Sequence, residues 1–440
     1  MDLSNNEINQ ASPFGIYSPY GEFSLDKSEF ASQSDISEHL LDLGVKWVQE
    51  VSVYKGMGTI PLTINLYSRI GREGGMIPQK IDDPNIIECY KTELSQTITN
   101  MGNRVKFWEV DTEPDGIGGW SHNPNGYANL LKMTHSVIKS KCPDCKVMFG
   151  GLSGGQAVLD IQGLTFLERV LESGAAGYFD GLEFKRHHTS SQDYSLLKSH
   201  FSSIKNILSK YRIDIHKIPV FLETAMYDGD PNDPVPNPLV RDLSVQSEVE
   251  QAIGMIKTYV YGLSLGIEKI FWNLIYERSD YEPGHTQPFP QNPFNHYGLI
   301  NNPTNSDGLS HKKLAYYAYK KMVEILDGSD WNGVQVIQES DDIFIAKFTN
   351  RNRPIYVAWW DYFKQPGRDP NKSNQVTLTG LRGNQVRITT AVPVNASGKD
   401  IVDYTNGFQE EVLPVQNGKL SLTLGASPVF IESHELIHSD

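Results

Sequence analysis

The 440-residue sequence contains only three cysteines, no long apolar run and no excess of positive charge. Three cysteines do not make a disulfide framework. No apolar run approaches the ~20 residues that a membrane-spanning helix needs, so we expect no membrane partner. The formal net charge of -14 argues against nucleic acid or an anionic membrane as a partner, because both are themselves negatively charged.

The sequence also has no signal-like start, no internal repeat and no low-complexity tract. Residues 1–7 lack the basic and apolar regions of a signal peptide, so we expect a cytoplasmic protein or one whose signal was removed. Hydrophobic residues make up 39% of the chain, which is ordinary for a globular protein. The length exceeds one ordinary core and favours two domains, or a barrel with an appendage. Nothing in the sequence indicates an oligomeric state.

Two of the cysteines form a CxxC stretch, Cys142-Pro-Asp-Cys145. No second CxxC or His pair follows to complete a zinc site, so we expect no metal, and we expect no other cofactor. Unreactive thiols are our default interpretation, and a local disulfide is the main alternative. Cys89 stands alone within a helical pattern, and we expect it in the core.

Eight strand-like segments, most of them followed by an amphipathic helical pattern, fill the first three quarters of the chain. The strands are expected at residues 14–19, 47–54, 61–67, 106–113, 146–152, 181–187, 219–223 and 269–276. Strands that alternate with helices imply a parallel sheet, and eight such units close most simply as a (β/α)8 TIM barrel. The class is therefore α/β, and a helix over residues 312–326 closes the barrel.

From about Trp331 the pattern changes to short alternating strands without helices between them, punctuated by turn residues. This pattern predicts an antiparallel β-sandwich of about 110 residues. We therefore expect two domains, a barrel over residues 1–330 and a β-sandwich over residues 331–440.

Two of the predicted strands end on a glutamate. In the first, residues 106–115, strand-forming residues run up to Pro114, and alternation would place Glu109, Asp111 and Glu113 on one face, with Glu113 at the tip. In the second, an apolar run delivers Glu223 just before a polar loop. A retaining glycoside hydrolase uses two such carboxyl groups, one to protonate the leaving oxygen and one to attack the anomeric carbon. A Glu-Pro after a strand fits a simple turn equally well, so the pair matters more than either stretch.

A barrel whose fourth strand ends Trp108-Glu-Val-x-x-Glu-Pro114, whose seventh ends Phe221-Leu-Glu-Thr224, and which carries a small β-sandwich resembles glycoside hydrolase clan A. The likeness is greatest to the family 39 type and covers nearly the whole chain. It implies that Glu113 is the acid/base and Glu223 the nucleophile.

Three positions depart from that clan's pattern. Thr112 stands where the clan has the Asn that binds the sugar 2-hydroxyl, and Lys185 and His187 stand where the sixth strand has a His and a Tyr. A threonine donates one hydrogen bond but is shorter than asparagine and lacks its amide. We therefore expect Thr112, Lys185 and His187 to contact the substrate, with an altered contact at the 2-position.

Several neighbouring polar residues have two interpretations. His187 and Arg69 are candidate donors that keep the nucleophile ionised, although an arginine at a strand end also suits a structural ion pair. Glu109 fits a buried partner for a basic residue. Asp111 either tunes Glu113 or replaces it as the acid, and we favour Glu113.

Aromatic residues provide candidate sugar platforms. Trp272 fits the floor of a subsite, because apolar sugar faces stack on indole, and equally fits the wall of the barrel. Trp120, Tyr227 and Tyr276 lie in or beside the loops after strands four, seven and eight, the face on which barrel sites form. Long loops at 228–237 and 278–297 would wall the cleft and favour exo action.

The basic run 185–188 fits either the solvated base of a loop or a pocket for an anionic sugar. Together these observations predict a metal-independent retaining glycoside hydrolase that cleaves β-linked glycans of an oligo- or polysaccharide. Because Thr112 replaces the usual amide, a carbohydrate-binding protein with a degenerate glycosidase site is the alternative. A scaffold protein that uses its sandwich is a third hypothesis.

Overall fold

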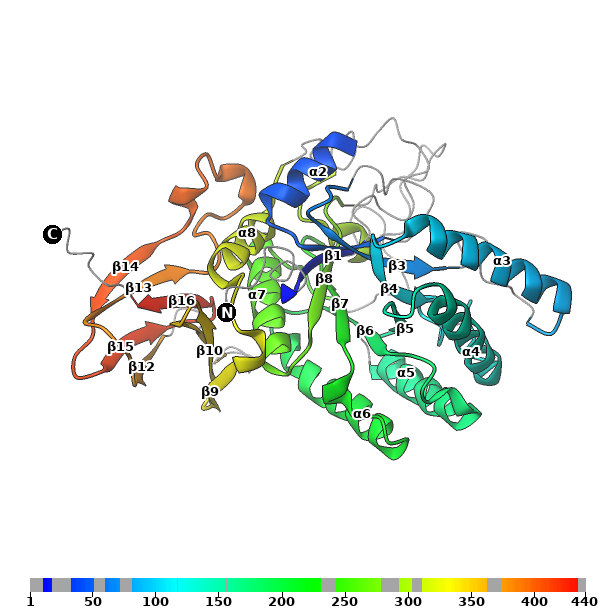
Figure 1. Ribbon diagram of the computed structural model, residues 1–440. Helices are drawn as coiled ribbons and strands as arrows, with labels where there is room; N and C mark the ends of the chain where they lie inside the picture. The colour runs from blue at the N-terminus through cyan, green and yellow to red at the C-terminus, as the bar shows by residue number, and fades with distance from the viewer. Residues whose placement is uncertain are drawn as a thin grey trace.

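The computed structural model describes residues 11–17, 33–50, 60–71, 81–116, 118–154, 157–230, 243–277, 293–302, 311–361 and 373–433. A strand barrel with surrounding helices lies beside a domain of antiparallel strands (Figure 1). Among the described helices, none is long and apolar enough to cross a membrane.

Eight parallel strands form a closed barrel in chain order, which confirms the predicted (β/α)8 fold. The strands are β1 (Phe14–Tyr17), β2 (Trp47–Glu50), β3 (Asn65–Ile70), β4 (Val105–Val110), β5 (Lys146–Leu152), β6 (Gly181–His188), β7 (Val220–Met226) and β8 (Lys269–Asn273). The last strand pairs with the first, with Trp272 opposite Ile16. Each strand overlaps one of the predicted segments.

The barrel's outer layer consists of α2 (Gln33–Asp42), α3 (Pro84–Met101), α4 (Pro124–Lys141), α5 (Ala157–Val170), α6 (Leu196–Lys210), α7 (Glu248–Ser264) and α8 (Leu314–Leu326). Local sequence sets where these helices begin. In α7 the Ser247 side chain accepts the backbone N–H of Glu250, and the Glu250 side chain accepts that of Ser247, which satisfies two free donors of the first turn. In α3, Asp83 caps the helix and proline occupies its first position.

Side chains alternate along each strand between the barrel interior and the helices. The lower interior is filled by six aromatic rings, one methionine and one leucine, from Tyr17, Trp47, Tyr67, Phe107, Met148, Phe221, Phe271 and Leu274. Trp108 and Trp272 point the other way and pack in the core that the helices cover. This packing leaves the carboxyl ends of the strands for polar interior side chains.

The C-terminal region forms the predicted sandwich of antiparallel strands. A six-stranded sheet has the order β14-β13-β16-β11-β10-β9, and β12 pairs with β15. The strands are β9 (Gln335–Ser340), β10 (Ile343–Asn350), β11 (Arg353–Trp360), β12 (Asn374–Thr379), β13 (Gln385–Thr390), β14 (Glu410–Pro414), β15 (Lys419–Leu424) and β16 (Val429–Ser433). The domain boundary near residue 331 stays a prediction.

The barrel and the sandwich meet through a buried ion pair. On α7 the Lys257 ammonium lies 2.7 Å from the Asp361 carboxylate, and both side chains are almost fully buried. The rings of Tyr194 and Trp359 pack edge to face across the same contact, 5.4 Å apart. The sandwich is therefore packed directly against the barrel, on the side of α7 and α8 (Figure 1).

Candidate active site

The candidate site lies at the carboxyl ends of β4, β6, β7 and β8, inside the barrel mouth. Active sites of such barrels form at this end, because the loops that follow the strands converge there. The structure brings Glu113, Lys185, His187 and Glu223 together at this point. Asn273, which the sequence did not single out, joins them from β8.

Glu223 on β7 is fully buried and contacts three donors. Its Oε1 accepts a hydrogen bond from the Asn273 amide at 2.8 Å and lies 3.3 Å from Nε2 of His187. Its Oε2 lies 2.7 Å from the Lys185 ammonium. Burial alone would raise the pKa of Glu223, but Lys185 and His187 together hold that pKa well below its usual range. Glu223 is therefore an ionised carboxylate in a dry setting.

Glu113 follows the end of β4 in a different environment. Its backbone φ is 43°, in the left-handed region, and its N–H donates to the carbonyl of Gly151 on β5 at 2.9 Å. Its side chain is 48% exposed, and Oε1 lies 3.6 Å from the Lys185 ammonium. One carboxyl group is thus open to solvent while the other is enclosed.

Lys185 on β6 lies between the two glutamates and is only 4% exposed. Its ammonium sits 5.0 Å from the centre of the Tyr17 ring. Burial would lower the pKa of Lys185, but Glu223, Tyr17 and Glu113 raise it well above its usual value, so the side chain is charged. Gly151 makes room for it, because a Cβ there would lie 3.2 Å from Lys185 Cε.

The ammonium also limits the separation of the two carboxylates. It contacts Glu223 at 2.7 Å and Glu113 at 3.6 Å, so the nearest carboxylate oxygens are no farther apart than these two distances combined. That limit on one pair of oxygens is compatible with the ~5–5.5 Å that separates the two carboxyl groups of retaining glycosidases.

A second polar group lies deeper in the barrel. Arg69 Nε pairs with Glu109 at 2.9 Å, and Arg69 also donates to the Tyr17 hydroxyl at 2.8 Å. The Gln49 amide donates to Glu109 at 2.9 Å and to Glu183 at 3.0 Å. Burial and the nearby Glu109 charge raise the pKa of Glu183 well above its usual value. Arg69 and Glu109 therefore form a buried structural ion pair. This is the partner expected for Glu109 and one of the two interpretations of Arg69.

Asp111 does not share a face with Glu113, contrary to the alternation expected from the sequence. The strand ends at Val110, and φ at Asp111 is 63°, so the two-residue period does not continue. The Asp111 carboxylate accepts the Thr112 N–H at 2.9 Å and the Trp120 indole N–H at 3.1 Å. Trp120 thus holds the loop after β4, and the Thr112 hydroxyl has no hydrogen-bond partner among the residues that the structure describes.

Two predicted sugar platforms lie in packed surroundings. Trp272 is fully buried in the core beneath the helices, and its indole donates to the carbonyl of Tyr297 at 3.0 Å. Alternation along β8 turns Asn273 into the barrel and Trp272 out of it. Tyr227 is also buried and donates to the carbonyl of Ser244 at 2.6 Å. We therefore leave both rings out of the proposed subsite.

The predicted walls of the cleft fall largely outside the described residues, which omit 231–242 and 278–292. Of the flanking aromatic residues, Tyr276 is partly buried and packs edge to face with His39 at 5.8 Å. Tyr297 packs against the His187 ring at 5.2 Å. Tyr297 thus supports a residue that contacts Glu223.

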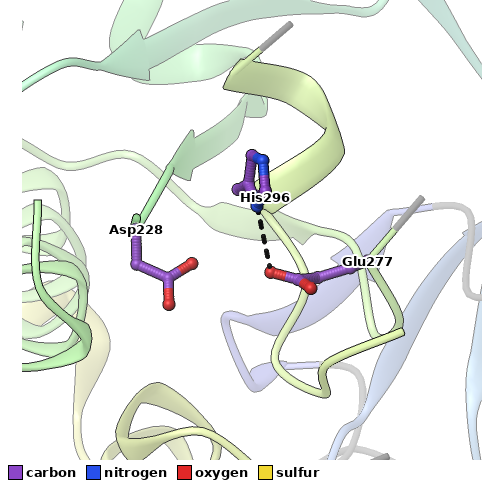
Figure 2. A group of neighbouring side chains, drawn as sticks. All are labelled: Asp228, Glu277 and His296. Atoms are coloured by element: carbon purple, nitrogen blue, oxygen red, sulfur yellow. Dashed lines mark ion pairs between the residues drawn. The ribbon is translucent and has the colours of Figure 1, made fainter. Parts of the chain in front are cut away.

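A buried charged cluster lies in the loops that follow β7 and β8. Figure 2 shows Asp228, Glu277 and His296 converging from three segments, with His296 3.6 Å from Glu277. The Lys313 ammonium pairs with Glu277 and lies 2.5 Å from Asp228. Burial raises the pKa of Asp228 to about 6, whereas Lys313 and His296 outweigh burial and lower that of Glu277 to about 2. The Lys313 ammonium thus contacts two of the three side chains that together could hold a metal ion.

Lys313→Met is expected to lower the free energy of unfolding by ~3–5 kcal/mol at pH 7, because two buried carboxylates lose their common cation. Without that cation the pKa of Asp228, already above its unfolded value, rises further, and that of Glu277 rises as well. The variant therefore binds more protons on folding than the wild type does and regains stability as pH falls to 5. Denaturant titrations at both pH values measure this difference.

The neighbouring Lys312 provides a control for this substitution. Its side chain is 33% exposed and pairs with Asp42 at 3.0 Å on the surface. Lys312→Met should therefore cost less than about 1 kcal/mol. A Lys313→Met loss that is equally small, or that does not shrink at pH 5, would contradict the buried ion-pair interpretation.

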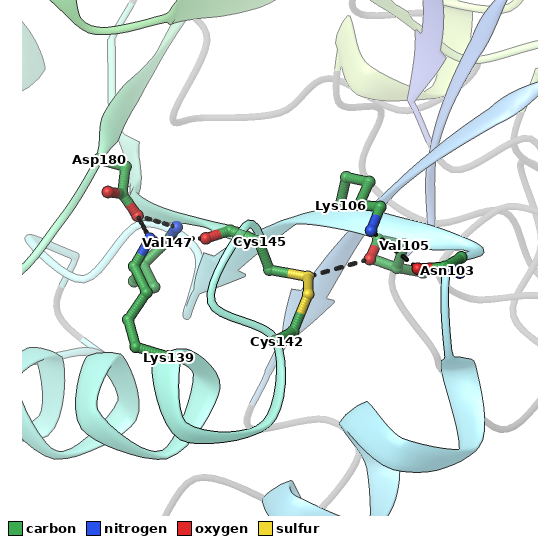
Figure 3. Close-up of a disulfide and its surroundings, with 8 residues drawn as sticks. All are labelled: Asn103, Val105, Lys106, Lys139, Cys142, Cys145, Val147 and Asp180. Atoms are coloured by element: carbon green, nitrogen blue, oxygen red, sulfur yellow. Dashed lines mark hydrogen bonds and ion pairs between the residues drawn. A yellow bond between two sulfur atoms is a disulfide. The ribbon is translucent and has the colours of Figure 1, made fainter. Parts of the chain in front are cut away.

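The CxxC stretch forms a disulfide, so the default interpretation of unreactive thiols is wrong (Figure 3). Cys142 and Cys145 lie in the turn between α4 and β5, where their Cα atoms are 5.3 Å apart, within bonding range. Lys139 donates to the Cys145 carbonyl at 2.7 Å and fixes the same turn. Cys89 was also predicted wrongly, because it lies on the exposed face of α3.

No family model and no curated protein sequence matches this chain. Solved structures do. A family 39 glycoside hydrolase from Bacteroides cellulosilyticus has 15% identity and a TM-score of 0.63, with 98% of this chain and 82% of that chain covered. An alpha-L-arabinofuranosidase from Thermotoga maritima has 13% identity and a TM-score of 0.59, with 95% of each chain covered.

A xylanase of glycoside hydrolase family 30 from Clostridium acetobutylicum is similar over 96% of each chain, with 12% identity and a TM-score of 0.54. At such identities the likeness establishes the fold. This chain therefore has the barrel-and-sandwich fold that these glycoside hydrolases share, over nearly its whole length.

Proposed function

We propose that the protein is a retaining glycoside hydrolase acting on β-linked glycans, with Glu113 as acid/base and Glu223 as nucleophile. The observation that carries the proposal is the Lys185 ammonium, which contacts both carboxylates at the barrel mouth and so limits their separation. The glycosidase fold supports it. The carbohydrate partner is an oligo- or polysaccharide.

The environments of the two glutamates suit the two roles. Glu223 is buried and ionised, which suits attack on the anomeric carbon. Glu113 is half exposed, which suits a group that must release a leaving alcohol and then admit water. Asn273 and His187 hold Glu223 Oε1 and the Lys185 ammonium holds Oε2, so the carboxylate is fixed in orientation before the attack.

In the first step Glu223 forms a bond to the anomeric carbon while the bond from that carbon to the leaving oxygen breaks. The electron pair stays on the leaving oxygen, which takes the proton of Glu113. In the second step Glu113, now a carboxylate, takes a proton from water as the water oxygen attacks the same carbon. The ester bond breaks, and its electrons return to the Glu223 carboxylate.

The structure changes one expectation about the substrate. Lys185 already contacts two carboxyl groups, of which Glu223 is ionised, and is nearly fully buried, so its charge does not require an anionic sugar. The basic run 185–188 therefore does not support an anionic sugar as the substrate. Thr112 and His187 remain the proposed contacts to the reacting sugar.

The test is covalent labelling with slow 2-fluoro aryl glycosides, chosen after a panel of aryl β-glycosides has identified the sugar. We expect the label on Glu223, since attack at the anomeric carbon forms a glycosyl-enzyme. NMR of the first-formed product should show retained anomeric configuration. A label on another residue, or an inverted product, would overturn the proposal.

A carbohydrate-binding protein with a degenerate site is the second candidate, because Thr112 stands where the resemblance implies an amide. It predicts that glycans bind without release of aryl alcohol from any member of the panel. Release that depends on Glu223 would exclude it.

A further inference from the structure

We infer that Lys185 is a shared counter-ion, whose ammonium pairs with Glu223 before the glycosyl-enzyme forms and with Glu113 afterwards. This inference rests on the proposed function and concerns how its two steps are connected. Lys185 acts through the two carboxyl groups and is therefore a positioning residue.

The charges of the reaction lead to this inference. Before the first step Glu223 is a carboxylate and Glu113 carries a proton, so the ammonium faces one negative charge. After that step Glu223 is a neutral ester, and Glu113 has given its proton to the leaving oxygen and is the carboxylate. In both states the site holds one carboxylate and one ammonium, but on different glutamates.

The geometry places one cation within reach of both. Lys185 Nζ lies 2.7 Å from Glu223 and 3.6 Å from Glu113, so a small rotation at the end of the side chain exchanges the partners. The lysine is only 4% exposed, so little water competes for its charge. Gly151 leaves the space beside Lys185 Cε in which this rotation takes place.

The other groups around Lys185 leave these two carboxylates as its partners. Tyr17 from β1 presents its ring, and Arg69 from β3 is paired with Glu109. Glu183 accepts the Gln49 amide, and burial favours its neutral form. His187, on the same strand as Lys185, contacts Glu223. An unpaired cation would be costly in this dry setting, which favours a lysine that always has a partner.

The experiment uses the intact protein and the dinitrophenyl glycoside of the sugar identified by the panel. This leaving group departs without protonation, so the second step limits kcat, and the acid limb of its pH profile reports Glu113 in the glycosyl-enzyme. Lys185 stabilises the Glu113 carboxylate. Lys185→Met should therefore shift the midpoint of this acid limb to higher pH by about one unit or more. Lys185→Arg keeps the charge and should restore most of the shift.

Two further variants separate this effect from a loss of structure. Lys269→Met removes another buried lysine of the barrel interior, which lies 5.3 Å from the Trp47 ring at the opposite end of β8. It should lower thermal stability without moving the limb. Gly151→Ala keeps Lys185, but the added Cβ would lie 2.8 Å from Glu183 Oε1 and 3.2 Å from Lys185 Cε, so it crowds both side chains and should move the limb even if Lys185→Met does not fold.

The outcomes are distinct. An unchanged limb in a folded Lys185→Met, or in Gly151→Ala where Lys185→Met does not fold, would overturn the inference. So would a loss of kcat/KM confined to anionic glycosides, which would make Lys185 a binding group for the substrate. Absence of covalent labelling at Glu223 in the wild-type protein would overturn the proposed function, and the inference with it.

Discussion

Glu223→Gln is expected to lower kcat by ~10⁴-fold or more on every aryl glycoside that the protein cleaves. Glutamine fills the same space and still accepts the Asn273 hydrogen bond, but its amide oxygen is a poor nucleophile. Initial rates with dinitrophenyl glycosides measure the loss, and thermal unfolding shows that the variant remains folded.

Glu183→Gln provides the matched control for this substitution. Glu183 is also a fully buried interior glutamate, one strand away, and burial favours its neutral form. An amide is close to a protonated carboxyl in shape and hydrogen bonding, so most activity should remain. Equal losses in the two variants would indicate that Glu223 supports the structure rather than the reaction.

Glu113→Ala is expected to lower hydrolysis of glycosides with poor leaving groups by ~10²–10⁴-fold, because these substrates need a proton from the acid. Activated dinitrophenyl glycosides should form the glycosyl-enzyme almost as fast as in the wild type. Added azide should then restore turnover, because it attacks the glycosyl-enzyme without a general base. Detection of a glycosyl azide with retained configuration measures this rescue.

Asp111→Asn tests the alternative acid. Because the Thr112 N–H and the Trp120 indole already bind its carboxylate, we expect this variant to lose loop stability and to show no azide rescue. If Asp111→Asn shows the leaving-group dependence and Glu113→Ala does not, the acid is assigned to the wrong residue.

The barrel and the sandwich were predictable because their signals are local. Apolar periods of two and of three to four residues mark each strand and helix, and the alternation of the two implies a parallel sheet. The same rule failed at the end of β4. There the left-handed backbone of Asp111 and Glu113 ends the period, and nothing in the order of residue types reveals a positive φ.

The site was predictable only where a polar residue was expected at or near the end of a strand. Glu113, Lys185, His187 and Glu223 were expected there, and the structure groups them, although β7 continues past Glu223 to Met226. Asn273 was missed beside Trp272, because the direction of side chains on β8 depends on how the barrel closes. Applying alternation forwards from Lys269 through Phe271 places Asn273 on the same face of β8.

Tyr17 and Gly151 surround Lys185 but lie on strands that are distant from it in the sequence. Tyr17 places its ring beside Lys185, and Gly151 contributes by having no side chain. The disulfide was left open for a related reason: spacing allows Cys142 and Cys145 to pair, but the turn that joins them is a property of the fold.

The left-handed backbone at Asp111 and Glu113 means that folding and catalysis can favour different residues in this loop. Side chains other than glycine adopt this conformation at a cost of about 1 kcal/mol. A library of variants sorted only for abundance should therefore tolerate or favour glycine at position 113, whereas sorting for sugar release should retain glutamate there. The difference between the two sorted populations would locate the reactive loop without a ligand-bound structure.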